Sequence, residues 1–273
     1  MQNYMLVMGQ YGILKNGVMV LYPILFHIGS IEVRAWGVMV SLGIILGTFI
    51  AFRLARREGQ DGNLVFDYVL YAVISGFLGA RIWEVIFSWE NFAGAPLEAL
   101  KFWSGGLSIQ GAVAGGLLFT LWFIRRNNLN FWHFADILAP GLIAGQAIGR
   151  IGCFLNGDAY GIPAQSGWGV AYRPGTPAYS AYGGAPLVPA ELLEGAGDLA
   201  IMALLLLLFS RRPFNGFIAL MYFVLYSALR FTLEFWRGDS LLMTEGLKAA
   251  QVSSIVIALA AIGVIIFKMR RRA

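Results

Sequence analysis

Two apolar segments of the chain end in charged and amide side chains that could bind a ligand. Arg150, Asn156 and Asp158 close one long hydrophobic run, and Arg230 with Glu234 lies late in another. A charge at membrane depth costs free energy unless a partner or a ligand uses it. Guanidinium groups bind phosphate bidentately. Two such arginines in one apolar chain therefore predict a site for an anionic headgroup.

Further acidic side chains share this level of the molecule. Glu191 and Glu194 open the apolar run that follows Asp158 and its loop, which places them at the same outer level as Arg150. Charges that step across the bilayer would indicate a transport path. Charges that converge at one leaflet instead favour a site in the outer leaflet.

Each charged pair also has a purely structural interpretation. Arg230 with Glu234, and Arg81 with Glu84, are spaced as internal salt bridges that tolerate burial. Such a pair would need no ligand. That interpretation is weaker for Arg150 and Arg230 together, because the nearby acids would then have to neutralise both and leave no role for Asn156.

Glycine is frequent, with 34 copies, and its positions suggest two roles. Gly105 and Gly106 stand at the mouth of an apolar run, where freed backbone amides could face a ligand, although a simple turn is the alternative. Pairs at four-residue spacing allow membrane helices to approach closely. These pairs are Gly43/Gly47, Gly111/Gly115 and Gly145/Gly149.

Composition places the chain in a membrane. Of 273 residues, 58% are hydrophobic and 13% are charged, and mean hydropathy is +0.69, which excludes an ordinary soluble domain. The net charge of +5 comes from short clusters beside apolar runs, so nucleic acid is not an expected partner. One cysteine and two histidines cannot form a disulfide or a histidine-rich metal site. No phosphate-binding glycine loop is present, and we expect neither metal nor cofactor.

The apolar runs predict an all-α integral membrane protein with about seven transmembrane helices. Each run has about the twenty residues that a crossing requires. We expect helices over 33–54, 64–87, 107–124, 131–154, 189–209, 217–236 and 250–267.

Two segments lie outside these helices. Residues 1–32 lack a convincing signal peptide and are expected to form an amino-terminal interfacial arm, with a disordered leader as the alternative for the first 17. Residues 33–273 should form a single polytopic domain. Its outer loop at about 158–188 is rich in Gly, Ala, Pro and Tyr, and it is either a substrate lid or a plain connector.

Residues 149–161, Gly-Arg-Ile-Gly-Cys-Phe-Leu-Asn-Gly-Asp-Ala-Tyr-Gly, resemble the signature of prolipoprotein diacylglyceryl transferases. The resemblance extends along most of the chain after the first twenty residues. It includes residues 23–29, 34–37, 79–81, 103–111, 189–194 and 226–237.

The resemblance implies a specific reaction. A diacylglyceryl group passes from phosphatidylglycerol to the lipobox cysteine thiol of an exported prolipoprotein, and glycerol phosphate is released. The implied partners are phosphatidylglycerol, prolipoprotein signal peptides with a lipobox cysteine, and the lipid bilayer. The implied location is the bacterial cytoplasmic (inner) membrane, with a multi-pass chain whose active site faces the outer leaflet.

The resemblance also assigns roles to residues. Arg150 and Arg230 match the two arginines with which the family holds the headgroup, and Glu234 and Gln110 complete the expected catalytic set. Residues expected to bind lipid or substrate are Trp36, Arg81, Gly105, Gly106, Cys153, Asn156, Asp158, Gly161, Glu194, Tyr226 and Arg237.

Three positions depart from the family pattern. Gln110 stands where many members carry histidine, and glutamine cannot accept a proton. Cys153 replaces a common asparagine, and Trp36 replaces a common tyrosine. We expect the positive field of Arg150 and Arg230 to acidify the substrate thiol, while a nearby carboxylate or the lipid phosphate takes its proton.

Two functions remain open at this point. One is the transferase, and the other is a catalytically altered paralogue that binds or moves anionic phospholipid. The arginine pair suits both. The Gly-Gly-Leu motif, Asn156 and the carboxylates of Glu194 and Glu234 favour the enzyme, because a binder has less use for acids around its cations.

Loop charges predict the orientation of the chain. Basic residues gather in alternate loops, and the positive-inside rule makes those loops cytoplasmic. The amino terminus should therefore lie outside and the carboxyl terminus inside. The clustered residues are Arg53, Arg56, Arg57, Arg125, Arg126, Arg211, Arg212, Lys268 and Arg270 to Arg272.

Reporter fusions test this topology. A reporter after Arg272 should show cytoplasmic-type activity, and one within residues 161–186 should show periplasmic-type activity. Reversal of either result would contradict the predicted orientation.

Overall fold

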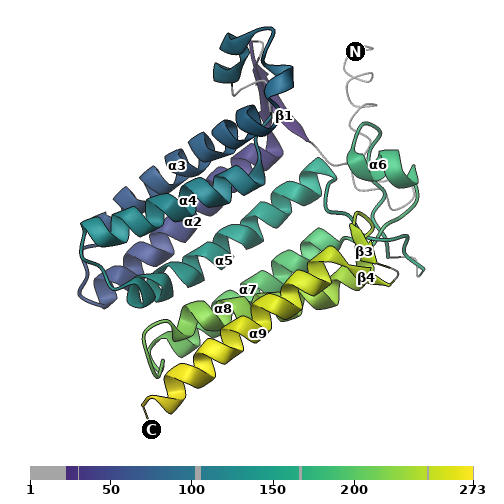
Figure 1. The fold of residues 1–273 in the computed structure, drawn as a ribbon. Coiled ribbons are helices and arrows are strands. Elements are labelled where there is room, and N and C mark those ends of the chain that lie inside the picture. The colour runs from purple at the N-terminus through teal and green to yellow at the C-terminus, as the bar shows by residue number, and fades with distance from the viewer. Residues whose placement is uncertain (1–22, 30, 102–105, 166–167, 245, 273) are drawn as a thin grey trace, which may run out of the picture. The chain divides into compact units, whose positions relative to one another are not determined.

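The computed structural model describes residues 23–29, 31–101, 106–165, 168–244 and 246–272, and helices dominate it (Figure 1). The predicted all-α architecture is confirmed. Each predicted run is a helix whose ends differ by a few residues from the expected ones. The long helices are α2 (Ala35–Arg57), α3 (Asn63–Phe87), α4 (Ile109–Arg126), α5 (Phe131–Asn156), α7 (Ala190–Phe209), α8 (Phe217–Leu233) and α9 (Ala249–Arg270).

Six of these helices are long and apolar enough to cross a membrane. Among the described helices of 18 residues or more, α4 is the exception. Its 18 residues include Gln110 near the start and Arg125 and Arg126 at the end, which lower its apolar content. A total of seven crossings therefore stays a prediction.

The chain forms two compact units. One unit contains residues 50–137, and the other contains the described residues before position 50 and after position 137. Helices α2 and α5 contribute to both units, because the division falls inside each of them.

Glycines hold α3 and α4 together in the 50–137 unit. Gly79 faces Gly111 and Gly115, and a Cβ atom added to Gly79 would lie 3.0 Å from the Cα of Gly115. The two helices pack with their backbones in contact, as small-residue spacing allows. The hydroxyls of Tyr68 and Thr120 meet at 2.9 Å across the same interface. Two short 3₁₀ helices, η1 (Trp89–Asn91) and η2 (Pro96–Leu100), follow α3.

The other unit begins with a β-hairpin. Strands β1 (Ile24–Ile28) and β2 (Ile31–Arg34) pair antiparallel and lead directly into α2. This hairpin occupies part of the expected interfacial arm, and residues 1–22 lie outside the described chain. Gly43 and Gly47 of α2 lie against Gly145 and Gly141 of α5, again with backbone contact.

Helices α7, α8 and α9 complete this unit and lie side by side (Figure 1). Between α8 and α9 the chain forms the 3₁₀ helix η4 (Glu234–Trp236) and a small hairpin of β3 (Leu242–Thr244) and β4 (Leu247–Lys248). Many large apolar side chains of these helices face outward, among them Leu207 at 74% exposure. Such exposure is expected for a surface that contacts lipid tails.

The loop after α5 is folded rather than extended. It contains the short helix α6 (Pro177–Tyr182), which Thr176 caps. Isolated β-bridges join Gly161 to Arg237, and Pro163 and Val170 to Leu187. Its small core consists of Phe154, Tyr172, Ala178 and Leu187. The bridges place this loop at the end of the unit where η4 lies.

Gly141 provides a test of the helix packing. A Cβ at Gly141 would overlap the carbonyl group of Gly47, whereas a Cβ at Gly263 of α9 has no described atom within 4 Å. We expect Gly141→Ala to reduce stability by about 1–3 kcal/mol, and Gly263→Ala to be neutral or slightly stabilising, because alanine favours helix. Thermal unfolding in detergent measures both. Equal stability of the two variants would contradict the packing described.

Candidate active site

Helix α7 presents a row of buried acids. Glu191, Glu194 and Asp198 are all 0% exposed. Their spacing of three and four residues places them on one helix face. The same face continues with apolar Ile201 and Leu205. The buried face of α7 is thus acidic in the first half of the helix and apolar in the second half.

Glu194 is the centre of the charged group. Its Oε1 accepts a hydrogen bond from Nη2 of Arg150 at 2.6 Å and from the hydroxyl of Tyr226 at 3.1 Å. Its Oε2 accepts from Nη1 of Arg237 at 3.4 Å. Helices α5, α7 and α8 and the turn after η4 therefore meet at one carboxylate.

Gly195 permits the close approach of α7 to α5. A Cβ atom at Gly195 would lie 3.3 Å from the carbonyl oxygen of Ala147 and 3.3 Å from Cβ of Arg150. These distances are tighter than most such contacts. The missing side chain lets α7 approach α5 closely enough for Arg150 to reach Glu194.

Arg230 and Glu234 form the second charged pair. Nη1 of Arg230 lies 2.6 Å from Oε2 of Glu234, one helical turn away. Neither of these atoms has a hydrogen-bond partner among the described residues. The contact is therefore an ion pair, and the salt bridge predicted as the structural alternative is present.

Arg237 extends the contact around Glu194 to Asp239. Its Nε and Nη2 donate to the two carboxylate oxygens of Asp239 at 2.9 and 2.7 Å, while Nη1 reaches Glu194. The ammonium of Lys248 donates to the carbonyl oxygens of Arg237 and Glu234. The charged group thus contains alternating contacts between cations and acids, and the ammonium of Lys248 bonds to its backbone.

The turn after α5 places the amide and carboxylate of the signature. Gly157 and Ala159 both have positive φ, 72° and 61°, and Ala159 is unusual in this for a residue with a side chain. Between them, Asp158 accepts a hydrogen bond from Nδ2 of Asn156 at 2.7 Å. Cys153, a partly buried free thiol, interacts electrostatically with Asp158 and Arg150.

Glu191 anchors the folded loop to α7. The hydroxyl of Tyr172 donates to its Oε1 at 2.7 Å. Burial and the adjacent carboxyl of Glu191 raise the pKa of Tyr172. The phenol therefore stays protonated and remains a donor. Gly161 also holds this loop, through its bridge to Arg237.

Other predicted site residues lie in the 50–137 unit. The guanidinium of Arg81 donates to the backbone carbonyls of Ala99, Gly106, Glu98 and Lys101 at 2.8–3.1 Å. Arg81 thus fixes the segment that leads into α4. Gly106 has φ of +68°, as a turn glycine does, and Gly105 lies outside the described residues.

Gln110 is exposed at the start of α4, and its Oε1 accepts from the hydroxyl of Ser108 at 2.7 Å. Trp36, in the other unit, is 47% exposed on α2, beside Gly152 of α5. Arg150, Glu194, Tyr226 and Arg237 are joined directly by hydrogen bonds. Neither Gln110 nor Trp36 is part of that network as described.

Sequence reasoning missed three members of the charged group. Asp239 and Lys248 follow η4 in a polar stretch, where they resembled ordinary loop residues. Asp198 could have been recognised from the sequence, because a second acid four residues after Glu194 within an apolar run lies on the same helix face.

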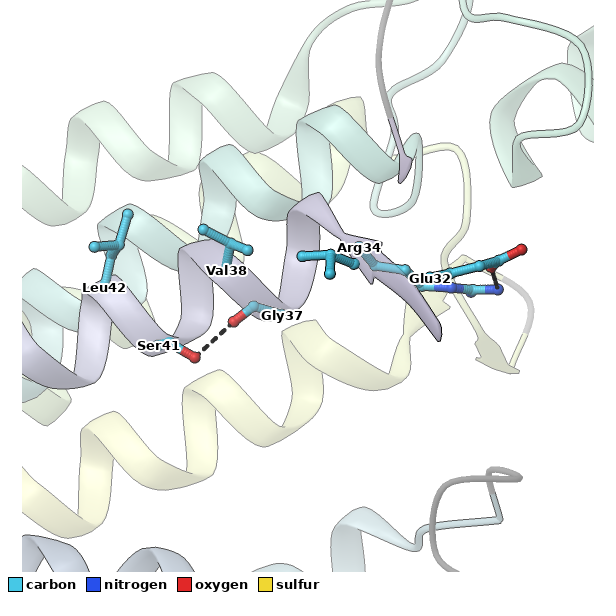
Figure 2. A pocket seen from close by; sticks show the side chains of 7 residues that line it. Glu32, Arg34, Gly37, Val38, Ser41 and Leu42 are labelled. Atoms are coloured by element: carbon cyan, nitrogen blue, oxygen red, sulfur yellow. Dashed lines mark hydrogen bonds and ion pairs between the residues drawn. The ribbon is translucent and has the colours of Figure 1, made fainter. Parts of the chain in front are cut away.

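Two hollows lie in the same unit. A shallow groove of 490 Å³ follows β2 and the first turns of α2 (Figure 2). The pair of Arg34 and Glu32, 3.1 Å apart, occupies one end, and Val38 and Leu42 lie toward the other. A second cavity, also of 490 Å³, is lined by Asn156 and by the cations of Arg34 and Arg173.

Comparison with known proteins identifies the family. A sequence model described as prolipoprotein diacylglyceryl transferase matches residues 23–267. A phosphatidylglycerol–prolipoprotein diacylglyceryl transferase of Gloeobacter violaceus is 39% identical over 252 residues, which cover 88% of this chain and 91% of the relative. One of Staphylococcus carnosus is 37% identical, covering 90% of each chain. One of Bacillus licheniformis is 35% identical, covering 91% of this chain and 93% of the relative. Together with the charged group around Glu194, these matches show that the chain belongs to the prolipoprotein diacylglyceryl transferase family.

Proposed function

We propose that this protein transfers the diacylglyceryl group of phosphatidylglycerol to the lipobox cysteine thiol of exported prolipoproteins. One observation carries the proposal. Arg150 and Arg237 share the buried carboxylate of Glu194, and Arg230 is paired with Glu234. These cations suit a phosphodiester, which offers oxygen acceptors in place of the carboxylate.

The reaction requires charge stabilisation rather than a cofactor. The thiol sulfur attacks the glyceryl carbon, an S–C bond forms, and the C–O bond to phosphate breaks. The bonding electrons move to the phosphate oxygen, which leaves as glycerol phosphate. Guanidinium groups held in place before the reaction stabilise that developing charge without reorganisation.

The remaining predicted residues receive supporting roles. Glu194 and Glu234 orient the arginines. Tyr226, through Glu194, and Asn156, through Asp158, shape the headgroup site. We assign Gln110, Arg81, Gly105, Gly106, Trp36, Cys153 and Gly161 to lipid or substrate contacts.

The same geometry supports a proposal for the location. We place the protein in the bacterial cytoplasmic membrane with its site at the outer leaflet. The charged group lies at the end of α7 that carries the folded loop, and Arg211 and Arg212 follow the opposite end of the same helix. The lipid-binding or lipid-moving alternative has no support from the relatives described above, all of which are named as transferases.

The arginines provide the first test. Arg150→Ala and Arg230→Ala should each abolish glycerol phosphate release from phosphatidylglycerol and a lipobox peptide. Lysine should restore little activity, because a point charge does not replace the planar fork. Arg211→Ala, at the far end of α7, is the matched control and should retain activity. Near-normal release by either site variant, at equal membrane abundance, would refute the assignment.

Glu194 provides a second test. Glu194→Gln keeps the side-chain shape but leaves Arg150 without its ion-pair partner and Arg237 with Asp239 alone. Breaking a buried pair in this way typically costs about 3–5 kcal/mol. Glu98→Gln is the control, because the pair of Glu98 and Lys101 is about half exposed and such surface pairs contribute about 0–1 kcal/mol. Thermal unfolding in detergent compares them. A Glu194→Gln protein as stable as Glu98→Gln would show that the charged group does not depend on this carboxylate.

A further inference from the structure

Asp198 is a buried acid without a hydrogen-bond partner among the described residues. It lies near the middle of the 20-residue helix α7 and is 0% exposed. Neither carboxyl oxygen has a hydrogen-bond partner among the described residues. A carboxyl group in the apolar interior is costly unless it is used. The position therefore requires a role.

Asp198 belongs to the charged group by position. It follows Glu194 by one turn on the same face, about 6 Å further along the axis, and it interacts electrostatically with Glu194 and Arg150. The rings of Tyr222 and Tyr226 stack 5.9 Å apart, and both tyrosines interact electrostatically with Asp198. The hydroxyl of Tyr222 is committed to Gln146, at 2.8 Å.

The other carboxyls of this face are already engaged. Glu194 accepts hydrogen bonds from two guanidiniums and a phenol. Glu191 accepts from Tyr172, and Glu234 is paired with Arg230. Within the described part of the chain, Asp198 is the buried acid of α7 that neither a cation nor a hydroxyl holds. It is therefore the one most able to take up a proton.

The direction of attack favours the same residue. Displacement at carbon needs the nucleophile opposite the departing oxygen. If phosphate binds at the level of Arg150 and Glu194, the glyceryl carbon lies toward the acyl chains. The thiol must approach from that deeper side, and Asp198 lies one turn deeper than Glu194.

Among the described contacts of the charged group, none involves a histidine. His27 lies in strand β1, and His133 lies 4.0 Å from Glu58. Gln110 cannot accept a proton. A carboxylate is the remaining type of base in the described charged group.

We propose that Asp198 is a catalytic residue that accepts the proton of the substrate thiol. This proposal rests on the transferase function proposed above. The S–H bond breaks toward the Asp198 carboxylate as the S–C bond forms and the C–O bond breaks. The proton then leaves with the glycerol phosphate dianion or passes to water, which restores the carboxylate.

A selenocysteine substrate distinguishes a base from a structural residue. A selenol is ionised at neutral pH, so it needs no base, whereas a thiol does. We would compare lipobox peptides with cysteine or selenocysteine, using phosphatidylglycerol and the full-length protein. Asp198→Asn should reduce kcat for the cysteine peptide by about 10²–10⁴-fold, the usual contribution of a general base. It should leave kcat for the selenocysteine peptide within a few fold of the unmodified protein.

Asp198→Leu serves as a second variant, because an apolar residue of similar volume is tolerated where a buried charge is removed. It should show the same selective loss. Asp67→Asn, an exposed acid on α3, is the control and should change neither rate. KM for phosphatidylglycerol should be similar in all variants, since Asp198 is not assigned to the phosphate.

Three results would overturn the proposal. Full activity of Asp198→Asn with the cysteine peptide would show that the acid is not needed. Equal loss with both peptides would show a structural role. Absence of transfer by the unmodified protein with either peptide would refute the transferase function itself, which separates the two failures.

Discussion

The buried contact of Glu194 with Arg150 and Arg237 is the constraint on which one end of the unit that contains α7 and α8 depends. Charges in an apolar interior persist only when they compensate one another. One carboxylate here serves two guanidiniums and a phenol. Gly195 brings α5 against α7, and the turn after η4 returns Arg237 to α7. The helix arrangement at this end follows from the need to complete that contact.

The same compensation makes the group suitable for a phosphodiester. Arg237 is fixed by Asp239, and Lys248 stabilises the backbone around it through two carbonyls. These contacts, with the pair of Arg230 and Glu234, hold the cations in position. A lipid phosphate can therefore bind to groups that are already oriented. Preorganisation of this kind is a major source of catalytic stabilisation.

Helices were predictable from sequence because about twenty consecutive apolar residues have few alternatives in a bilayer. The pairing of Arg230 with Glu234 was also visible, since four-residue spacing aligns side chains on a helix. The contact of Arg150 with Glu194 joins residues 44 positions apart, so local spacing could not reveal it. Arg81 shows the same limit. Its hydrogen bonds reach backbone carbonyls 17–25 positions away, which local spacing does not indicate, while its pair with Glu84 and its contact with substrate stay predictions.

Selective lipid binding tests the central claim most directly. Native mass spectrometry of the purified protein, with phosphatidylglycerol and phosphatidylcholine of identical acyl chains, reports which headgroup is retained. The account predicts preferential retention of phosphatidylglycerol, and loss of that preference when Arg150 and Arg230 are both replaced by methionine. Equal retention of the two lipids by the unmodified protein would contradict the claim that its buried cations form an anionic headgroup site.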